Sequence, residues 1–274
     1  MIVLGVLGTL VVGGYAAVCG LVYSNQDRLL YFPDDYFITD PASINLDFEE
    51  FSVEVSPGVT VHGWIVETDP GAPWILQFHG NAGNISNRVD HLKLFNELGF
   101  NGVLFDYRGY GKSTGTPSED GLVEDGLAVV KYLKEEKDVD GRFLIYWGES
   151  LGGAVASAVA VKEEPRALIL KSTFTSVPNL AGELYPFLPV TYLSKTRFET
   201  KNLVPNFLFP KLIIHGHADT VVPFHHGQRL YQLSLEPKTF LKVNRGHNAS
   251  PLDLGDEFKQ TVQGFVIDAV PQDY

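Results

Sequence analysis

The stretch Gly148-Glu149-Ser150-Leu151-Gly152 decides the fold of this 274-residue chain. The apolar run from Phe143 to Trp147 precedes it and is typical of a buried strand. The small residues from Gly153 to Ala160 follow it and suit a helix packed closely on a sheet. A strand, Gly-x-Ser-x-Gly and a helix together form a nucleophile elbow, whose tight turn holds the serine in a strained conformation. We therefore predict Ser150 at a helix N-terminus, where unpaired N–H groups favour negative charge.

A second match to the same pattern, Gly111-Lys112-Ser113-Thr114-Gly115, lacks this context. No helix can begin at Ser113, because Gly115 and Pro117 break the chain after it. The Gly-Lys-Ser also resembles the end of a phosphate-binding loop, but that motif needs a glycine where Asp106 stands. We therefore predict that Ser113 is a loop serine, and we reject the phosphate loop.

A serine hydroxyl becomes a nucleophile when a base takes its proton and a carboxylate orients that base. The predicted strand 211–215 leads to Asp219, and the predicted strand 238–243 leads to His247. Taken singly, Asp219 could be a turn aspartate and His247 a loop histidine. Because both follow neighbouring strands, as Ser150 does, the three side chains can converge on one edge of a sheet. We predict a catalytic triad of Ser150, Asp219 and His247.

The negative charge that develops on a substrate oxygen needs two N–H donors, one of them from the residue after the nucleophile. That residue is Leu151. The second donor comes from the loop after the third strand, which we place at residues 79–84. The amide of Asn81 is the best candidate, with Ala82 next. The alternative is that this glycine-rich loop is only structural.

These motifs resemble those of the α/β-hydrolase superfamily, and specifically its membrane-anchored "α/β-hydrolase domain" serine hydrolases, related to dienelactone hydrolases and acyl-protein thioesterases. The resemblance covers nearly everything after the N-terminal segment and is carried by residues 79–84, 106–113, 148–153, 215–223 and 246–248. His217 departs from it, since relatives often have an acidic or small polar residue there. The resemblance implies an α/β fold with a mostly parallel sheet of about eight strands and helices on both faces.

The resemblance also implies hydrolysis of carboxylic esters or thioesters without a cofactor, and leaves the substrate open. A serine peptidase on the same fold is the close alternative. A catalytically silent membrane-tethered scaffold is the alternative from another class, and the intact serine, aspartate and histidine argue against it.

A metal site is the other chemistry to weigh. His215-x-His217-x-Asp219 resembles the start of a binuclear metallohydrolase signature, but Thr220 stands where the signature has a further histidine. The motif also lies late in the chain, which leaves little room for other ligands. We therefore expect no metal and interpret His215 as structural.

Composition limits the possible partners. The chain has 33 acidic and 21 basic residues, and its net charge of −12 argues against nucleic acid, which needs a basic face. A small-molecule or lipid acyl substrate remains compatible with this charge. The single cysteine, Cys19, excludes an intrachain disulfide. Nothing in the sequence indicates the oligomeric state.

The first residues predict a membrane anchor. Ile2 to Tyr23 carry no charged side chain, and as a helix they would span about 33 Å, enough for a bilayer core. A cleaved signal peptide is the main alternative, but no Lys or Arg precedes the run. We predict an N-terminal transmembrane helix over 1–24 and a linker over 25–47. The orientation is open, because only Asp27 and Arg28 mark a flank.

The rest of the chain, 48–274, is predicted to be one hydrolase domain. Predicted strands cover residues 48–55, 60–66, 74–78, 102–106, 143–147, 167–171, 211–215 and 238–243, and predicted helices 88–98, 122–136 and 258–270. Between about 174 and 210, prolines interrupt a series of aromatic residues. We predict that this insertion is a short lid lining an acyl pocket, with ordinary core packing as the alternative. Asp106 and Arg108 are expected to hold their own loop, and Glu149 to join a local hydrogen-bond network.

Overall fold

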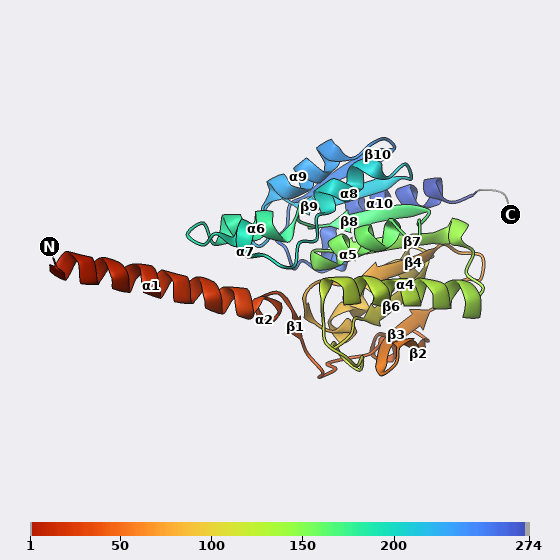
Figure 1. Cartoon of the computed structure of the whole chain (residues 1–274). Coiled ribbons are helices and arrows are strands. Elements are labelled where there is room, and N and C mark those ends of the chain that lie inside the picture. The colour runs from red at the N-terminus through yellow and green to blue at the C-terminus, as the bar shows by residue number, and fades with distance from the viewer. Residues whose placement is uncertain (1, 272–274) are drawn as a thin grey trace.

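The computed structural model describes residues 2–271 and the side chains of residues 9–271. Its centre is an eight-stranded sheet in the order β10-β9-β8-β7-β4-β6-β3-β2 (Figure 1). The strands are β2 (Glu49–Ser56), β3 (Val59–Val66), β4 (Trp74–Phe78), β6 (Asn101–Asp106), β7 (Leu144–Glu149), β8 (Ala167–Lys171), β9 (Lys211–Gly216) and β10 (Lys238–Val243). The pairs β2–β3 and β3–β6 are antiparallel and all other pairs are parallel, so β3 is the one strand of this sheet that runs in the opposite direction. The predicted mostly parallel sheet is confirmed.

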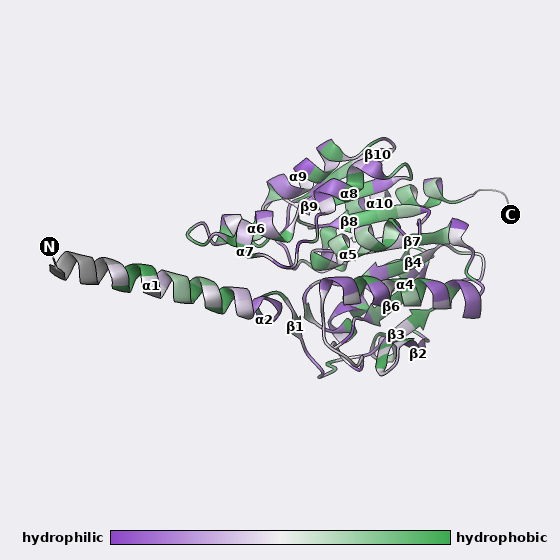
Figure 2. Ribbon diagram, in the orientation of Figure 1, coloured by the Kyte–Doolittle hydropathy of each residue, from purple (hydrophilic) through white to green (hydrophobic). Residues whose placement is uncertain are grey.

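Helices cover both faces of the sheet. One face packs against α4 (Glu119–Glu136), α5 (Leu151–Ala160) and α9 (Phe224–Leu233), and the other against α3 (Val89–Glu97) and α10 (Asp256–Ala269). In β4, Leu76 and Phe78 enter the first core and Ile75 enters the second. This alternation is the two-residue period of a strand that is buried on both sides, and it explains the continuous apolar runs in the sequence. Figure 2 shows the apolar colour concentrated on the inner strands, whereas α4 alternates between polar and apolar residues.

The predicted element boundaries hold to within about three residues. The largest shift is at α4, which begins at Glu119 rather than at Leu122. Ser118 caps this helix by accepting a hydrogen bond from the N–H of Gly121, at 3.1 Å. The first residues of α4, Glu119 to Gly121, carry no apolar side chain, so the apolar pattern begins later than the helix.

The N-terminal segment contains α1 (Ile2–Ser24) and α2 (Gln26–Leu30). Within the residues that the structure describes, no helix is both long and apolar enough to cross a membrane. The first eight residues of the predicted anchor lie outside the described side chains.

The segment after α2 is packed on the rest of the protein, although the sequence suggested a linker. β1 (Phe32–Pro33) pairs in parallel with β5 (Ala82–Gly83), and the side chain of Tyr31 is buried. A short 3₁₀ turn, Pro41–Ile44, follows.

The insertion after β8 contains three short helices: α6 (Val177–Leu184), α7 (Val190–Leu193) and α8 (Thr200–Leu203). Its aromatic residues divide into two groups. The rings of Phe198, Phe207 and Phe209 belong to the core of the α5 face, as the packing alternative expected. The rings of Tyr185, Phe187 and Tyr192 are exposed and lie around the turn between α6 and α7.

Candidate active site

Ser150 occupies a sharp turn between β7 and α5. Its backbone angles, φ 53° and ψ −119°, are strained for a residue with a side chain. The turn is possible because α5 begins with small residues pressed on the neighbouring chain. A Cβ on Gly152 would clash with the carbonyl oxygen of Phe78, and one on Gly153 would clash with Oγ1 of Thr173. The sequence pattern therefore reflects close backbone approach as well as a tight turn.

The structure brings the three predicted side chains together. Nε2 of His247 lies 3.1 Å from Oγ of Ser150, and Nδ1 of His247 lies 2.7 Å from Oδ2 of Asp219. A carboxylate only accepts hydrogen bonds, so this contact places the proton of a neutral His247 on Nδ1. Nε2 is then free to accept the proton of the serine hydroxyl.

The loop after β9 holds Asp219 in its charged form. The N–H groups of Val221 and Val222 donate to Oδ1 of Asp219 at 2.9 and 2.8 Å. Burial opposes the charge, but the hydrogen bonds from His247 and these amides outweigh burial and lower the pKa of Asp219. The carboxylate therefore stays ionised and fixed in orientation.

The residues of the two predicted N–H donors lie close to Ser150. Leu151 is the first residue of α5, so its N–H is one of the four that a helix leaves without an internal partner. Gly80 brings the other loop close, since a Cβ there would lie 3.7 Å from Cβ of Ser150. In the part of the chain that the structure describes, no hydrogen bond uses the N–H of Asn81, the next residue. Both predicted donors are thus available to an anionic oxygen.

The rest of Asn81 is held tightly. Its carbonyl oxygen accepts hydrogen bonds from the N–H of Phe32 and from Oη of Tyr110, each at 2.9 Å, and its side-chain amide donates to the carbonyl oxygen of Leu30 at 3.0 Å. The segment after α2 therefore supports this loop directly. The sequence did not reveal this role, because a two-residue strand such as β1 has no periodic pattern to detect.

Glu149 lies in a buried ionic cluster. Its carboxylate contacts the ammonium of Lys171 at 2.7 Å and Nε2 of His91 at 3.1 Å. Burial opposes the charge, but Lys171 and His91 outweigh it and hold the pKa of Glu149 well below its usual range. The expected local network is confirmed. Lys171 was not anticipated, because nothing in an apolar strand pattern indicates which residue its final lysine will meet.

The second Gly-x-Ser-x-Gly match is a structural loop, as predicted. Oγ of Ser113 donates to the carbonyl oxygen of Asp106 at 2.7 Å and accepts from the N–H of His62 at 2.9 Å. Arg108 holds the same loop to α4 through Asp125 and Glu124. No described interaction links Ser113 to His247.

Two of the three side chains of the suspected metal motif, His215 and Asp219, make hydrogen bonds within the protein. Nε2 of His215 donates to the carbonyl oxygen of Val222 at 2.9 Å, and Asp219 binds His247. The ring of His217 packs against Phe224 instead.

A different histidine cluster joins the insertion to α9. Among the described residues, Glu183, His225 and His226 have ligand atoms within 4.8 Å of one another. The N–H of Thr175 donates to Nδ1 of His226 at 3.1 Å, so the proton of the neutral ring is on Nε2, 3.4 Å from Glu183. A protonated nitrogen is no metal ligand. We therefore interpret the cluster as a set of polar contacts that holds α6 against α9.

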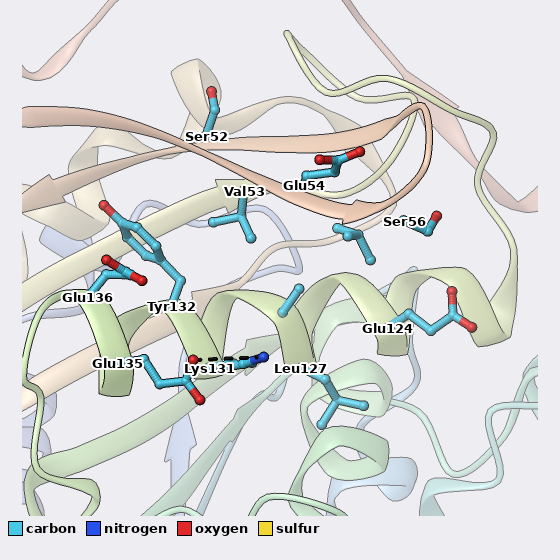
Figure 3. Close-up of a pocket in the computed structure, with 12 residues that line it drawn as sticks. Ser52, Val53, Glu54, Ser56, Glu124, Leu127, Lys131, Tyr132, Glu135 and Glu136 are labelled. Atoms are coloured by element: carbon cyan, nitrogen blue, oxygen red, sulfur yellow. Dashed lines mark ion pairs between the residues drawn. The ribbon is translucent and has the colours of Figure 1, made fainter.

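A groove of about 800 Å³ lies between β2 and α4 (Figure 3). It is lined by acidic side chains of α4 and by the edge strand, with Lys131 paired to Glu135. None of the triad residues lines it. The groove is therefore separate from Ser150 and takes no part in the chemistry of the triad.

This fold and this arrangement at the strand ends define a class, and the chain belongs to it: the α/β-hydrolase superfamily. It is 34% identical over 249 residues to the alpha/beta hydrolase domain-containing protein WAV2 of Arabidopsis thaliana, which covers 82% of this chain and 79% of that protein. It is 30% identical over 266 residues to the protein bem46 of Schizosaccharomyces pombe, with 90% and 87% covered. The family profile described as serine aminopeptidase, S33, matches residues 72–206.

Solved structures show the same fold. An esterase of Pyrococcus furiosus, Pf2001, superposes with a TM-score of 0.71 over 87% of this chain and 97% of that one, at 19% identity. This likeness shows the shared fold, and the relatives of 30% and 34% identity show the superfamily.

Proposed function

We propose that this protein is a membrane-anchored serine hydrolase that cleaves carboxylic esters or thioesters through an acyl-enzyme. One observation supports this proposal above all others: His247 lies 3.1 Å from Oγ of Ser150 and 2.7 Å from Asp219. These are the contacts that a nucleophile, a base and an orienting acid need.

In the proposed mechanism, Oγ of Ser150 attacks the acyl carbonyl carbon while Nε2 of His247 takes its proton. Asp219 stabilises the imidazolium that forms and does not itself take a proton. The imidazolium then gives its proton to the leaving group as the tetrahedral intermediate collapses to the acyl-enzyme. Water, activated by the same imidazole, attacks the acyl carbon and releases the acid and free Ser150.

The N–H groups of Leu151 and Asn81 would stabilise the tetrahedral oxyanion. Loss of one such donor typically lowers kcat by about 10²- to 10³-fold. Leu151 also stands at the positive end of α5, which adds to the effect.

We also propose that α1 is the membrane anchor. Residues 2–23 carry no charged side chain, and the exposed side chains of Leu10, Val11 and Leu21 would lie in contact with lipid. A lipid-like acyl substrate would then be met at high local concentration.

A peptidase is the second candidate, because the matching family profile is described as a serine aminopeptidase. The same triad can attack amides as well as esters. A panel of acyl substrates that share one acyl group but have alcohol, thiol or amine leaving groups separates the two. Esters and thioesters turned over at least tenfold faster than amides would support the proposal, and a preference for amides would replace it with the peptidase.

The proposal is tested by covalent labelling with a fluorophosphonate and by ester hydrolysis. Ser150→Ala should abolish both, since loss of the nucleophile costs on the order of 10⁶ in kcat. Ser113→Ala is the matched control, because it alters the other Gly-x-Ser-x-Gly serine, and it should still label. Labelling that survives in Ser150→Ala would exclude the proposed nucleophile.

A further inference from the structure

The turn between α6 and α7 exposes an unusual amount of aromatic surface. We call residues 184–193 the lid tip. Its side chains at Tyr185, Phe187 and Tyr192 are 57%, 88% and 90% exposed, and no residue in the segment is charged. Exposed apolar surface of this kind marks an interaction site.

The lid tip is fastened to the N-terminal helices. Oη of Tyr15 on α1 donates to the carbonyl oxygen of Phe187 at 2.9 Å. The side chain of Gln26 donates to the carbonyl oxygen of Leu193 and accepts from the N–H of Lys195, each at 2.8 Å. Figure 1 shows α6 and α7 projecting beside α1, away from the sheet. The lid tip therefore lies beside α1, and the two segments share the same environment.

The position along α1 can be estimated from helix geometry. Tyr15 precedes Ser24, the last residue of α1, by nine positions, which is about 14 Å of helix. A leaflet contributes about half of the roughly 30 Å hydrocarbon core. If α1 enters a bilayer near Ser24, the turn at Phe187 reaches the acyl chains of that leaflet.

The polar groups of the lid tip suit a medium without water, where each unpaired N–H or carbonyl is costly. Pro186 and Pro189 have no N–H to satisfy. The hydrogen bond between Tyr15 and Phe187 pairs a hydroxyl with a carbonyl that would otherwise both need water. At the base, the ammonium of Lys195 lies 4.0 Å from the centre of the Tyr23 ring, an arrangement that suits the boundary between lipid and water.

We propose that the lid tip is a second membrane contact, inserted beside α1 into the same leaflet. This inference rests on the proposed membrane anchoring of the hydrolase. The net charge of −12 opposes attraction to anionic headgroups, so the contact is apolar and suits phosphatidylcholine, which is zwitterionic and has no net charge. The N–H of Ser150 donates to the carbonyl oxygen of Lys171, the last residue of β8, which leads into the insertion. The insertion therefore begins close to the nucleophile.

The test uses the full-length protein in phosphatidylcholine vesicles with bromine on the acyl chains, which quenches tryptophan fluorescence on contact. The native Trp64, Trp74 and Trp147 are buried, and their signal is subtracted with the wild type. Phe187→Trp places a probe at the lid tip. Leu208→Trp is the control, because Leu208 is 73% exposed and precedes the amino end of β9, whereas the insertion leaves the carboxyl end of the neighbouring parallel strand β8.

We expect the probe at 187 to lose fluorescence at least about twofold and the probe at 208 to be unchanged. Equal quenching of both probes, quenching of neither, or failure of the protein to float with the vesicles would overturn the inference. A blue shift at 187 without bromine quenching would assign the lid tip to a protein contact, such as a second copy, and also overturn it. Fluorophosphonate labelling of the same samples reports on Ser150 separately, so loss of the lid contact and loss of the hydrolase are distinguishable.

Discussion

Ser150 shows how a single residue is held in an unfavourable conformation for chemistry. Its backbone angles cost on the order of 1–3 kcal/mol. The surroundings over-determine the position: the N–H of Ser150 donates to Lys171 at 2.9 Å, and Gly152 is pressed against β4. The hydroxyl is consequently fixed 3.1 Å from Nε2 of His247 before any substrate binds.

The tautomer of His247 leads to the first prediction. Asp219→Asn should lower kcat by about 10⁴. The amide of asparagine can donate to Nδ1 of His247, which leaves the proton of the ring on Nε2. A protonated Nε2 cannot accept the proton of Ser150. KM should change little. Asp253→Asn, at an exposed position, is the control and should be neutral. Steady-state kinetics on a soluble ester, with and without a chelator, would decide. Activity lost on chelation and restored by zinc would indicate a metal site instead.

The buried cluster at Glu149 gives the second prediction. Lys171→Met removes the ammonium that pairs with the buried Glu149 and leaves only the contact with His91, so it should lower the free energy of unfolding by about 3–5 kcal/mol. Adding Glu149→Gln should recover part of the loss. Lys134→Met removes a half-exposed pair with Glu163 and should cost no more than about 1 kcal/mol. Urea unfolding in mild detergent measures the free energy of unfolding of the wild type and of the three variants. A Lys171→Met variant no less stable than Lys134→Met would contradict the role given to the buried pair.

At the scale of elements, the strands were the easiest feature to predict. Each central strand is buried on both faces, so its residues are mainly apolar and bounded by turns. The elbow was equally clear, because steric limits at Gly152 and Gly153 leave no other residue type. These constraints are local, and they are therefore visible in a single sequence.

The elements that were missed depend on tertiary contacts. β1 is two residues long and is specified by its pairing with β5. The sequence of the insertion showed an aromatic pattern but not the direction of each ring, so the buried Phe207 and the exposed Phe187 looked alike. The triad residues could be predicted because they follow strand ends. The pairing of Lys171 with Glu149 could not be predicted, because it depends on which strands are neighbours in the sheet.

The link between the N-terminal segment and the Asn81 loop gives the third prediction. Asn81→Ala keeps the backbone N–H but removes the 3.0 Å hydrogen bond to Leu30. We expect kcat to fall by up to about tenfold, the equivalent of one net hydrogen bond, with KM nearly constant. Asn206→Ala removes a comparable bond on the surface and is the control. Unchanged kcat in Asn81→Ala would show that the segment does not support the loop.

At the scale of the whole molecule, buried histidines set the response to acid. Burial lowers the pKa of five of them: His62, His79, His91, His215 and His226. The pKa falls to about 3 for His79 and to about 4 for His226. The folded state therefore keeps them neutral at a pH where the unfolded chain protonates them. Burial raises the pKa of Asp106 and Asp125, which opposes the effect with fewer groups.

The fourth prediction follows from this imbalance. As the pH falls through about 6.5 toward 5, the unfolded state binds more protons, so the free energy of unfolding should fall. Each excess proton contributes about 1.4 kcal/mol per pH unit. Denaturant midpoints at pH 7.5, 6.5 and 5.5, all in one detergent, measure the slope. A midpoint that is constant or rises on acidification would contradict the assignment of neutral buried histidines.

The central claim is that Ser150 is the nucleophile, and mapping of a fluorophosphonate adduct on the wild-type protein tests it most directly. Cleavage after Lys and Arg places Ser150 in the peptide 143–162 and Ser113 in the peptide 113–131. Fragment masses then separate Ser150 from Ser157 within the first peptide. We predict a single adduct, on Ser150, that is absent in Asp219→Asn at short reaction times. An adduct on any other serine, or an unlabelled protein that still hydrolyses esters, would contradict the claim.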